Sequence, residues 1–322
     1  GDTPIKEIRP KMLKQHLEPI EKRGVLETLR RIISRLNEIF RYAATEELME
    51  DIYDRCQVLV LDAEGLQADR HAIGDALQGL HFDLVIDTAY TGEDAADLLN
   101  ALESYKDYVL ISSSAVYPEY APAPFTEEIQ LAENVHWGAY GTNKIAAETA
   151  LMQRNPKAYI LRPPYLYGPM NNVYREAFVF DCALADRKFY LPKDGSMKLQ
   201  FFHVKDLCRL MEVIIKEKPE EHILNVGNVE TVSIKDWVTK CYESLGKIPD
   251  FVNVYEDIEQ RNYFSFYNYE YYLDVSRQNK IYPETISLED GLRDSVKWYL
   301  EHSTEVNKKP YFKYINENLV ED

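Results

Sequence analysis

The 322-residue chain is 45% hydrophobic, which is enough for one large or two modest domains with a packed core. Its formal net charge of −17 argues against a protein that mainly neutralises nucleic-acid phosphates or binds an anionic membrane surface. No His or Cys spacing is typical of a metal site, and no apolar run approaches the roughly 18 residues of a membrane helix. Scattered cysteines without a CxxC motif favour a reduced, cytoplasmic setting.

The charge is unevenly distributed along the chain. Residues 1–50 hold 10 Lys/Arg and 9 Asp/Glu, whereas the remaining residues hold 27 and 45, which predicts a boundary near residue 50. Residues 10–47 are predicted to be helical, because apolar side chains recur at three- and four-residue steps from Leu29 to Ala43.

Beyond residue 56, short apolar runs alternate with helical segments. We expect strands at residues 57–62, 82–90, 107–114, 158–164 and 222–228. We expect helices at residues 69–79, 92–105, 140–154 and 205–217, and further helices that begin after Ser233 and Ser287. Buried strands that alternate with helices predict a parallel sheet covered on both faces.

Candidate catalytic side chains follow the third of these strands. The run ISSSAVY places three hydroxyls where the strand ends, which is where open parallel sheets bind ligands. Tyr140 and Lys144 then lie one helical turn apart, and a nearby ammonium lowers the pKa of a Tyr phenol toward working pH. The spacing alone is equally compatible with an ordinary exposed helix pair.

The order of these pieces resembles the extended short-chain dehydrogenases/reductases, which include the NAD(P)-dependent sugar-nucleotide epimerases and dehydratases. The resemblance spans residues 56–302 and rests on the runs VLISSSAVY, YGTNKIAAE, ILRPPYLYGPMNN, FFHVKDL, NVGNVETVSIKDWV and SLEDGLRDSVKWY. It implies a Rossmann-like parallel sheet with helices on both faces and a small C-terminal α+β substrate domain.

The same resemblance implies roles for individual residues. Ser113 is the expected catalytic hydroxyl, with Ser114 as the adjacent alternative, and Tyr140 is the expected acid/base. Lys144 would lower the pKa of Tyr140 and hold the nicotinamide ribose of NAD or NADP. The residues expected to contact the cofactor are Asp62, Asp69, Arg70, Ala89, Tyr140, Lys144 and Pro163. Those expected to contact a sugar or nucleotide-sugar substrate are Ser114, Asn171, Asn172, Lys198 and Tyr165.

Two features depart from the family pattern. No GxxGxxG phosphate loop is present, and Leu199 stands where the family often has a phosphate-binding Arg. Residues 58–77 can be placed as the family's second strand, with Asp62 on the adenosine ribose, or as a replacement first strand without a dinucleotide fingerprint. The first placement leaves the sheet without its first strand, so the N-terminal βα unit is expected to be incomplete.

Residues 1–48 resemble the core-binding helical segment of phage-type tyrosine recombinases. The recombinase catalytic set has no counterpart, and a nearly neutral segment favours helix packing over DNA contact. We therefore predict a helical segment at 1–52 and a dinucleotide-binding domain from 53–164 and parts of 165–232. A substrate domain is predicted from parts of 165–204 and 233–322.

Three functions remain open from the sequence. The first is an NAD(P)-dependent sugar epimerase, dehydratase or reductase. The second is a non-catalytic binding protein that has lost tight cofactor binding, and the third is a DNA-associated protein. A homodimer is possible through paired helices, although the added N-terminal helices could block that surface. His203 and the aromatic run 251–272 are expected to have structural roles.

Overall fold

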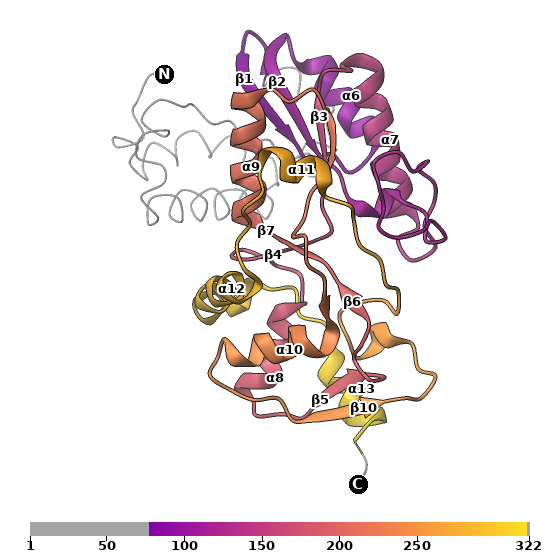
Figure 1. The fold of residues 1–322 in the computed structure, drawn as a ribbon, viewed down its shortest axis with the longest axis vertical. Coiled ribbons are helices and arrows are strands. Elements are labelled where there is room, and N and C mark those ends of the chain that lie inside the picture. Colours follow the sequence, from indigo (N-terminus) through magenta and orange to yellow (C-terminus); the bar gives the residue numbers. More distant parts are fainter. Residues whose placement is uncertain (1–76, 321–322) are drawn as a thin grey trace, which may run out of the picture. The chain divides into compact units, whose positions relative to one another are not determined.

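Among its described residues, the protein is built around a four-stranded parallel sheet (Figure 1). The computed structural model describes residues 77–320. The strands are β1 (His81–Asp87), β2 (Ser104–Ile111), β3 (Tyr159–Arg162) and β8 (Ile223–Asn225), and they adjoin in that order. The strand-helix alternation read from the sequence is thus confirmed as a Rossmann-like α/β fold.

The register of the strands brings their carboxyl ends to one edge of the sheet. Asp87 lies opposite Leu110, Ile111 opposite Leu161, and Arg162 opposite Asn225. Ligands of open parallel sheets bind outside this edge, because the loops that follow the strands meet there. The polar residues that follow β1, β2 and β3 are therefore the first candidates for a site.

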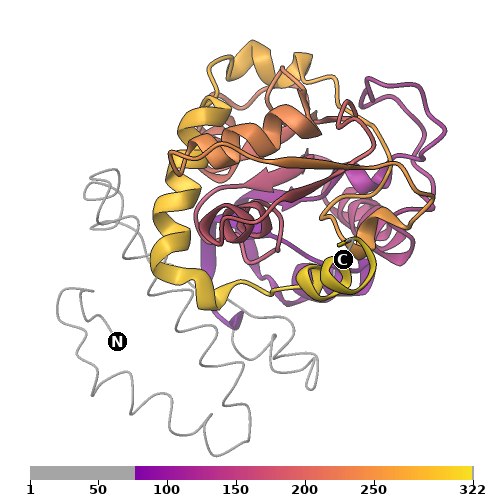
Figure 2. The same cartoon turned by 90° about the horizontal axis from the view of Figure 1, so that it is seen from below.

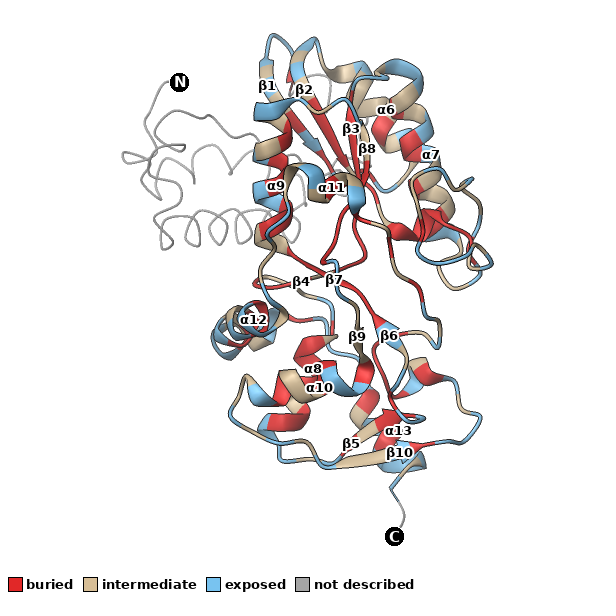
Figure 3. Ribbon diagram, in the orientation of Figure 1, coloured by how far each residue is buried: buried red, intermediate tan, exposed pale blue. Residues whose placement is uncertain are grey.

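Helices cover both faces of the sheet. On one face, α9 (Val204–Glu217) buries Leu207, Leu210 and Ile214 against Val109 and Leu161. Burial of each such side chain contributes roughly 1.5–3 kcal/mol. The helices α6 (Gly92–Ala101) and α7 (Ala139–Arg154) lie on the other side of the strands (Figure 1). Strand β3 is consequently buried along its whole length, and β2 is buried at residues 108–110 (Figure 3).

Strand β1 lies at an edge of the described sheet. Among the described strands it pairs only with β2, and Ile86 near its carboxyl end is 49% exposed. The strand expected at 57–62, the helix expected at 69–79 and the N-terminal helices lie outside the described residues, as do Asp62, Asp69 and Arg70.

The chain after β3 builds a second, mixed α+β region. Its strand pairs are β4 (Tyr165–Tyr167) with β7 (Phe201–His203), β5 (Phe189–Pro192) with β10 (Phe251–Val254), and β6 (Lys198–Leu199) with β9 (Val232–Ser233). The helices are α8 (Glu176–Leu184), α10 (Ile234–Glu243), α11 (Ser276–Ile281), α12 (Leu288–His302) and α13 (Tyr311–Asn318). Helices α8, α10 and α12 contact one another, and the yellow C-terminal helices lie at the rim of this region (Figure 2).

Several expected helix boundaries are confirmed. Ser233 and Ser287 cap α10 and α12, because each hydroxyl accepts from the backbone N–H three residues later, at 3.0 and 3.2 Å. The helix expected at 92–105 instead ends at Ala101, and Ser104 begins β2. Exposed and partly buried residues alternate over 104–107, as in a strand. The sequence prediction continued the helix into this segment because so short a run does not distinguish the two periods.

The aromatic run 251–272 packs the C-terminal region, as expected. Phe264, Phe266 and Tyr271 are buried in it, and Trp237 stacks on Phe201 with ring centroids 5.6 Å apart. Among residues 77–320, no helix is long and apolar enough to cross a membrane.

Glu176 introduces a pH dependence into this core. Its carboxyl group is buried, Oε1 accepts from Asn171 Nδ2 at 2.9 Å, and Oε2 has no hydrogen-bond partner among the described residues. Burial raises its pKa above the ordinary 4.5. The stability it contributes is therefore complete below pH 4.5 and is lost as pH rises through the raised pKa.

We expect Glu176→Gln to remove the loss of stability that the buried Glu176 carboxyl causes as pH rises. Urea unfolding of wild type and variant at several pH values measures it, and the variant should gain stability relative to wild type as pH rises. A difference between the two proteins that does not change with pH would contradict this assignment.

Candidate active site

Three consecutive serines follow β2, and the hydroxyl proton of only one of them has no acceptor among the described residues. Ser112 Oγ donates to Glu148 Oε1 at 2.5 Å, and Ser114 Oγ donates to the Tyr271 phenol oxygen at 3.1 Å. Ser113 Oγ accepts from the Ala115 N–H at 3.2 Å, and no described residue accepts its proton. Of the two serines that the resemblance left open, Ser113 is the one free to donate to a ligand. We call residues 112–116 the serine turn.

A close backbone approach brings the start of α7 to the serine turn. A Cβ on Gly141 would lie 2.4 Å from the Ala115 carbonyl oxygen, so only glycine fits this contact. The neighbouring Tyr140 is consequently held near the turn. Its side chain is 36% exposed and its ring centroid lies 5.9 Å from that of Tyr90. The sequence prediction that the turn and α7 form one site is supported by this packing.

Lys144 points at the carboxyl edge of the sheet. The side chain is 5% exposed, and its Nζ donates to the carbonyl oxygens of Thr88, Ala89 and Ile111 at 3.2, 2.7 and 3.0 Å. Burial lowers the pKa of Lys144, while the charges of Asp87 and Glu148 oppose that shift. The three ammonium protons therefore bridge the ends of β1 and β2.

Asp87 shapes the loop that receives Lys144. Its carboxylate accepts from the Tyr108 hydroxyl at 2.6 Å and from the Ala89 N–H at 2.7 Å. Burial raises the pKa of Asp87, although both hydrogen bonds and Lys144 act in the opposite direction. Its position at the end of β1 was the only sequence signal for this residue, and the sequence did not single it out.

A buried ion pair lies beneath the serine turn. Arg162 donates to both Glu148 oxygens, from Nε at 2.9 Å and Nη2 at 2.6 Å, and its Nη1 donates to the Tyr117 hydroxyl at 2.9 Å. Arg162 and Glu148 are 3% and 5% exposed. Glu148 is one turn beyond Lys144 on α7, so this pair ties α7 to β3 and to Ser112.

The other residues predicted to contact cofactor or substrate make contacts within the protein. The Pro163 carbonyl accepts from the Ser114 N–H at 2.9 Å, next to the proposed site. Asn171 donates to Glu176, and the Asn172 carbonyl accepts from the Asn307 N–H at 2.9 Å. Tyr165 is buried, with its ring centroid 4.7 Å from that of Phe266.

His203 has the structural role expected from its sequence context. It is buried, caps α9 through Nδ1, which accepts from the Lys205 N–H at 3.2 Å, and its pKa is lowered by burial.

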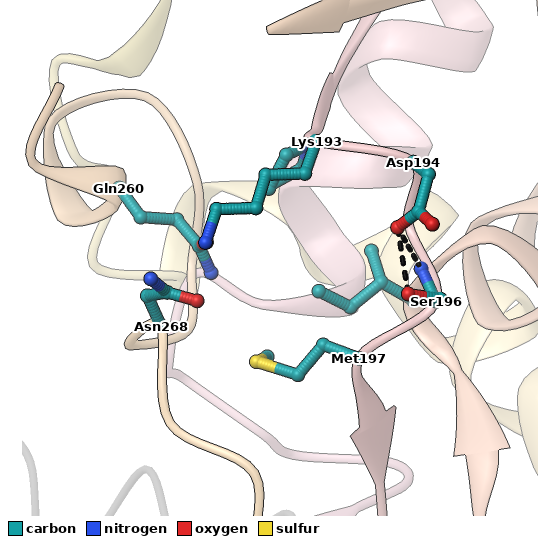
Figure 4. Close-up of a pocket in the computed structure, with 8 residues that line it drawn as sticks. Lys193, Asp194, Ser196, Met197, Gln260 and Asn268 are labelled. Carbon is teal, nitrogen blue, oxygen red and sulfur yellow. Dashed lines mark hydrogen bonds between the residues drawn. The ribbon is translucent and has the colours of Figure 1, made fainter. Parts of the chain in front are cut away.

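A cavity of about 180 Å³ opens in the C-terminal region. Figure 4 shows the Lys193 ammonium and the amides of Gln260 and Asn268 directed toward one another across it, with the Met197 thioether beside them. The predicted substrate contact Lys198 follows Met197 but does not line the cavity, and its backbone N–H donates to Glu270. The sequence did not identify these lining residues, because segments more than sixty residues apart meet there.

The described residues fit the nicotinamide half of a dinucleotide better than the phosphate half. Ala89, Pro163 and the Lys144 ammonium lie at the carboxyl ends of adjacent strands, and Tyr140 is exposed beside them. A glycine-rich phosphate loop is absent from the sequence. Lys144 must exchange at least one carbonyl for a ribose hydroxyl if a cofactor binds here.

Comparison with known proteins identifies related sequences. Residues 68–227 match the NAD dependent epimerase/dehydratase family, and residues 1–53 match the phage integrase central domain. A chloroplast stem-loop binding protein of 41 kDa from Arabidopsis thaliana is 26% identical over 246 residues, which cover 73% of this chain. The match spans 64% of that protein's length. A putative GDP-L-fucose synthase 2 from Oryza sativa subsp. japonica is 24% identical, with 77% of this chain and 76% of that protein covered.

Solved structures share the fold. The UDP-glucuronic acid 4-epimerase of Bacillus cereus, in complex with UDP-glucuronic acid and NAD, superposes with a TM-score of 0.56 at 19% identity. The match covers 74% of this chain and 86% of that one. RMD from Pseudomonas aeruginosa, complexed with NADPH, gives 0.57 at 17% identity, with 72% and 86% covered. The resemblances read from the sequence are thereby confirmed for both parts of the chain: residues 68–227 match the NAD dependent epimerase/dehydratase family, and a segment that matches the phage integrase central domain precedes them.

Proposed function

We propose that the protein is an NAD(P)-dependent epimerase, dehydratase or reductase that acts on a hydroxyl or carbonyl group of a nucleotide sugar. The observation that carries this proposal is the packing of the serine turn on the start of α7. It brings the free hydroxyl of Ser113 to the same edge of the sheet as Tyr140 and Lys144.

Each side chain would have a distinct task. Tyr140 takes the proton of the substrate hydroxyl, or returns it to a carbonyl oxygen, because its phenol is exposed to a ligand. Ser113 donates a hydrogen bond to the same oxygen and fixes its position. Lys144 places a positive charge one helical turn from Tyr140, and its ammonium would bind the nicotinamide ribose. A bound nicotinamide supplies hydride transfer to or from the substrate carbon.

The C-terminal cavity supports a substrate with a polar part away from the reacting carbon. Lys193 and Asp194 line it with opposite charges, and two amides offer both donors and acceptors. These groups suit a nucleotide portion better than an apolar one. The named activity of the rice relative, GDP-L-fucose synthase, belongs to the same substrate class.

A second candidate is a binding protein without catalysis. It is favoured by the missing glycine loop and by the Lys144 ammonium, whose three protons already have carbonyl acceptors. The Arabidopsis relative is named for stem-loop binding, which is a binding role. The N-terminal integrase-like match leaves DNA as a further ligand to test, although that segment is nearly neutral.

Thermal unfolding with NAD⁺, NADH, NADP⁺ and NADPH separates the two candidates. A dinucleotide at about 100 times its dissociation constant should add roughly 2.7 kcal/mol to the free energy of unfolding. The enzyme proposal predicts a rise in Tm with at least one of the four, and a smaller rise in Lys144→Met. If no dinucleotide at millimolar concentration raises the Tm, the enzyme proposal is wrong and the binding protein is the remaining candidate.

A further inference from the structure

Tyr271 reaches the serine turn from a distant part of the chain. The Ser114 hydroxyl donates to its phenol oxygen at 3.1 Å, across 157 residues of sequence. Both side chains are 4% exposed, so water does not compete strongly for this hydrogen bond. Other backbone anchors of the turn are the Leu161 carbonyl on β3, the Pro163 carbonyl just after β3 and the contact with Gly141 on α7. Tyr271 supplies the anchor from the C-terminal region.

A continuous stack of rings holds Tyr271 in place. Its ring lies 5.9 Å from Phe125 at an interplanar angle of 12°, and 5.2 Å from Tyr269 at 24°. Tyr269 in turn stacks on His136, with centroids 4.5 Å apart at 19°. Stacked aromatic pairs stabilise one another beyond what their buried area contributes. The stack therefore fixes the phenol oxygen against movement relative to Ser114.

The same stack also touches the segment that leads into α7. His136 precedes Tyr140 by four residues, and Asn134 donates to the Tyr117 carbonyl at 2.9 Å. Asn134 Oδ1 accepts from the His136 N–H at 3.0 Å, which fixes the loop that carries the last ring. Both the serine turn and the entry to α7 are thus braced by one aromatic column.

We propose that Tyr271 is a positioning residue that holds the serine turn so that Ser113, and not Ser114, presents its hydroxyl to the substrate. The inference rests on the proposed function for the role of Ser113. By occupying the Ser114 hydroxyl, Tyr271 removes it from competition and fixes the rotation of the turn. Ser113 is left with the one hydroxyl proton of the three serines that has no acceptor among the described residues.

The first test needs no turnover. A Ser113→Cys variant places a thiol at the position in question, and alkylation of that peptide by iodoacetamide is followed by mass spectrometry. Adding Tyr271→Phe removes one hydroxyl and keeps the ring stack, so the turn should loosen and the thiol should react severalfold faster. Tyr242→Phe is the matched control. Tyr242 is 2% exposed and donates to the Arg187 carbonyl at 3.2 Å, with no contact to the serine turn.

The second test uses turnover with the substrate of the wild-type enzyme. Tyr271→Phe should lower kcat by on the order of tenfold to a hundredfold with KM unchanged, because small displacements of a reacting group are costly. Ser114→Ala should have the same effect, and the double variant should be no worse than either, since both remove one interaction. Tyr242→Phe should keep kcat.

The outcomes test the proposed function and the positioning role of Tyr271 separately. Wild-type protein that turns over no nucleotide sugar would count against the proposed function, while the thiol measurement would still report on the turn. Equal alkylation rates in the Tyr271→Phe and Tyr242→Phe backgrounds would overturn the positioning role. So would an unchanged kcat in Tyr271→Phe.

Discussion

Replacement of Tyr140 by Phe should abolish turnover without unfolding the protein. A positioned general acid or base contributes about 10²- to 10⁴-fold, and the phenol is the group assigned that role. The ring stays in place beside Tyr90, and no described residue hydrogen-bonds to the Tyr140 hydroxyl. Its loss should therefore leave Tm near the wild-type value. Steady-state kinetics and thermal unfolding on the same preparation measure both quantities.

Tyr90→Phe is the matched control for this prediction. Tyr90 is 47% exposed, and its ring lies 5.9 Å from the Tyr140 ring, so the control removes a neighbouring phenol of similar accessibility. It should keep most of the activity. Retained turnover in Tyr140→Phe, or equal losses in both variants, would remove Tyr140 from the acid/base role.

Breaking the ion pair between Arg162 and Glu148 should cause the largest loss of stability. Arg162→Met leaves a carboxylate that is 5% exposed without its two charged hydrogen bonds. Removal of one partner from a buried pair typically costs about 3–5 kcal/mol, because the remaining charge is uncompensated. Urea unfolding of the variant measures this loss. Activity should also fall, since Glu148 lies one turn from Lys144 on α7.

Two further variants make that experiment decisive. The exposed pair of Lys106 and Asp83 is the control, and Lys106→Met should have no measurable effect on unfolding. Replacing both Arg162 and Glu148 by apolar residues should recover part of the stability lost in Arg162→Met. If Arg162→Met unfolds at the same urea concentration as the exposed control, the buried pair does not anchor α7.

The sheet and its covering helices could be predicted because their signals are local. The runs that became β1, β2, β3 and β8 are short and apolar, and α9 has an apolar stripe at helical spacing. Helix α8 was missed for the opposite reason. It buries Phe178, Val179 and Phe180 on successive faces, so no amphipathic period distinguishes it from a buried strand.

In the candidate site, too, local patterns predicted some residues, and contacts between distant segments determined the rest. Ser113, Tyr140 and Lys144 were found from their spacing and from a family resemblance, and the close contact at Gly141 places the turn and the helix together. The hydrogen bond from Ser114 to Tyr271 joins residues 157 positions apart, and no local pattern predicts such a pairing. The choice between Ser113 and Ser114 therefore depended on tertiary contacts.

The direction of Lys144 is the clearest addition to the sequence analysis. The expectation paired its ammonium with the phenol of Tyr140 and with a ribose. The structure directs it to three backbone carbonyls at the ends of β1 and β2, with Asp87 fixing one of the loops. A ribose hydroxyl that took the place of one carbonyl would leave that carbonyl without its donor, so the exchange is favourable only if a hydroxyl of the ribose donates to the released carbonyl. Cofactor affinity then depends on what replaces the missing phosphate loop.

The most direct test of the central claim is nicotinamide reduction by a nucleotide sugar. Purified protein is mixed with NAD⁺ or NADP⁺ and with UDP-, GDP- or dTDP-linked sugars in turn, and the absorbance of reduced nicotinamide is followed. Conversion of the sugar is measured in the same samples by chromatography, since an epimerase returns the hydride. The account predicts reduction or conversion with at least one pair in the wild type and none in Tyr140→Phe. Binding of a dinucleotide without reduction or conversion of any sugar would contradict it.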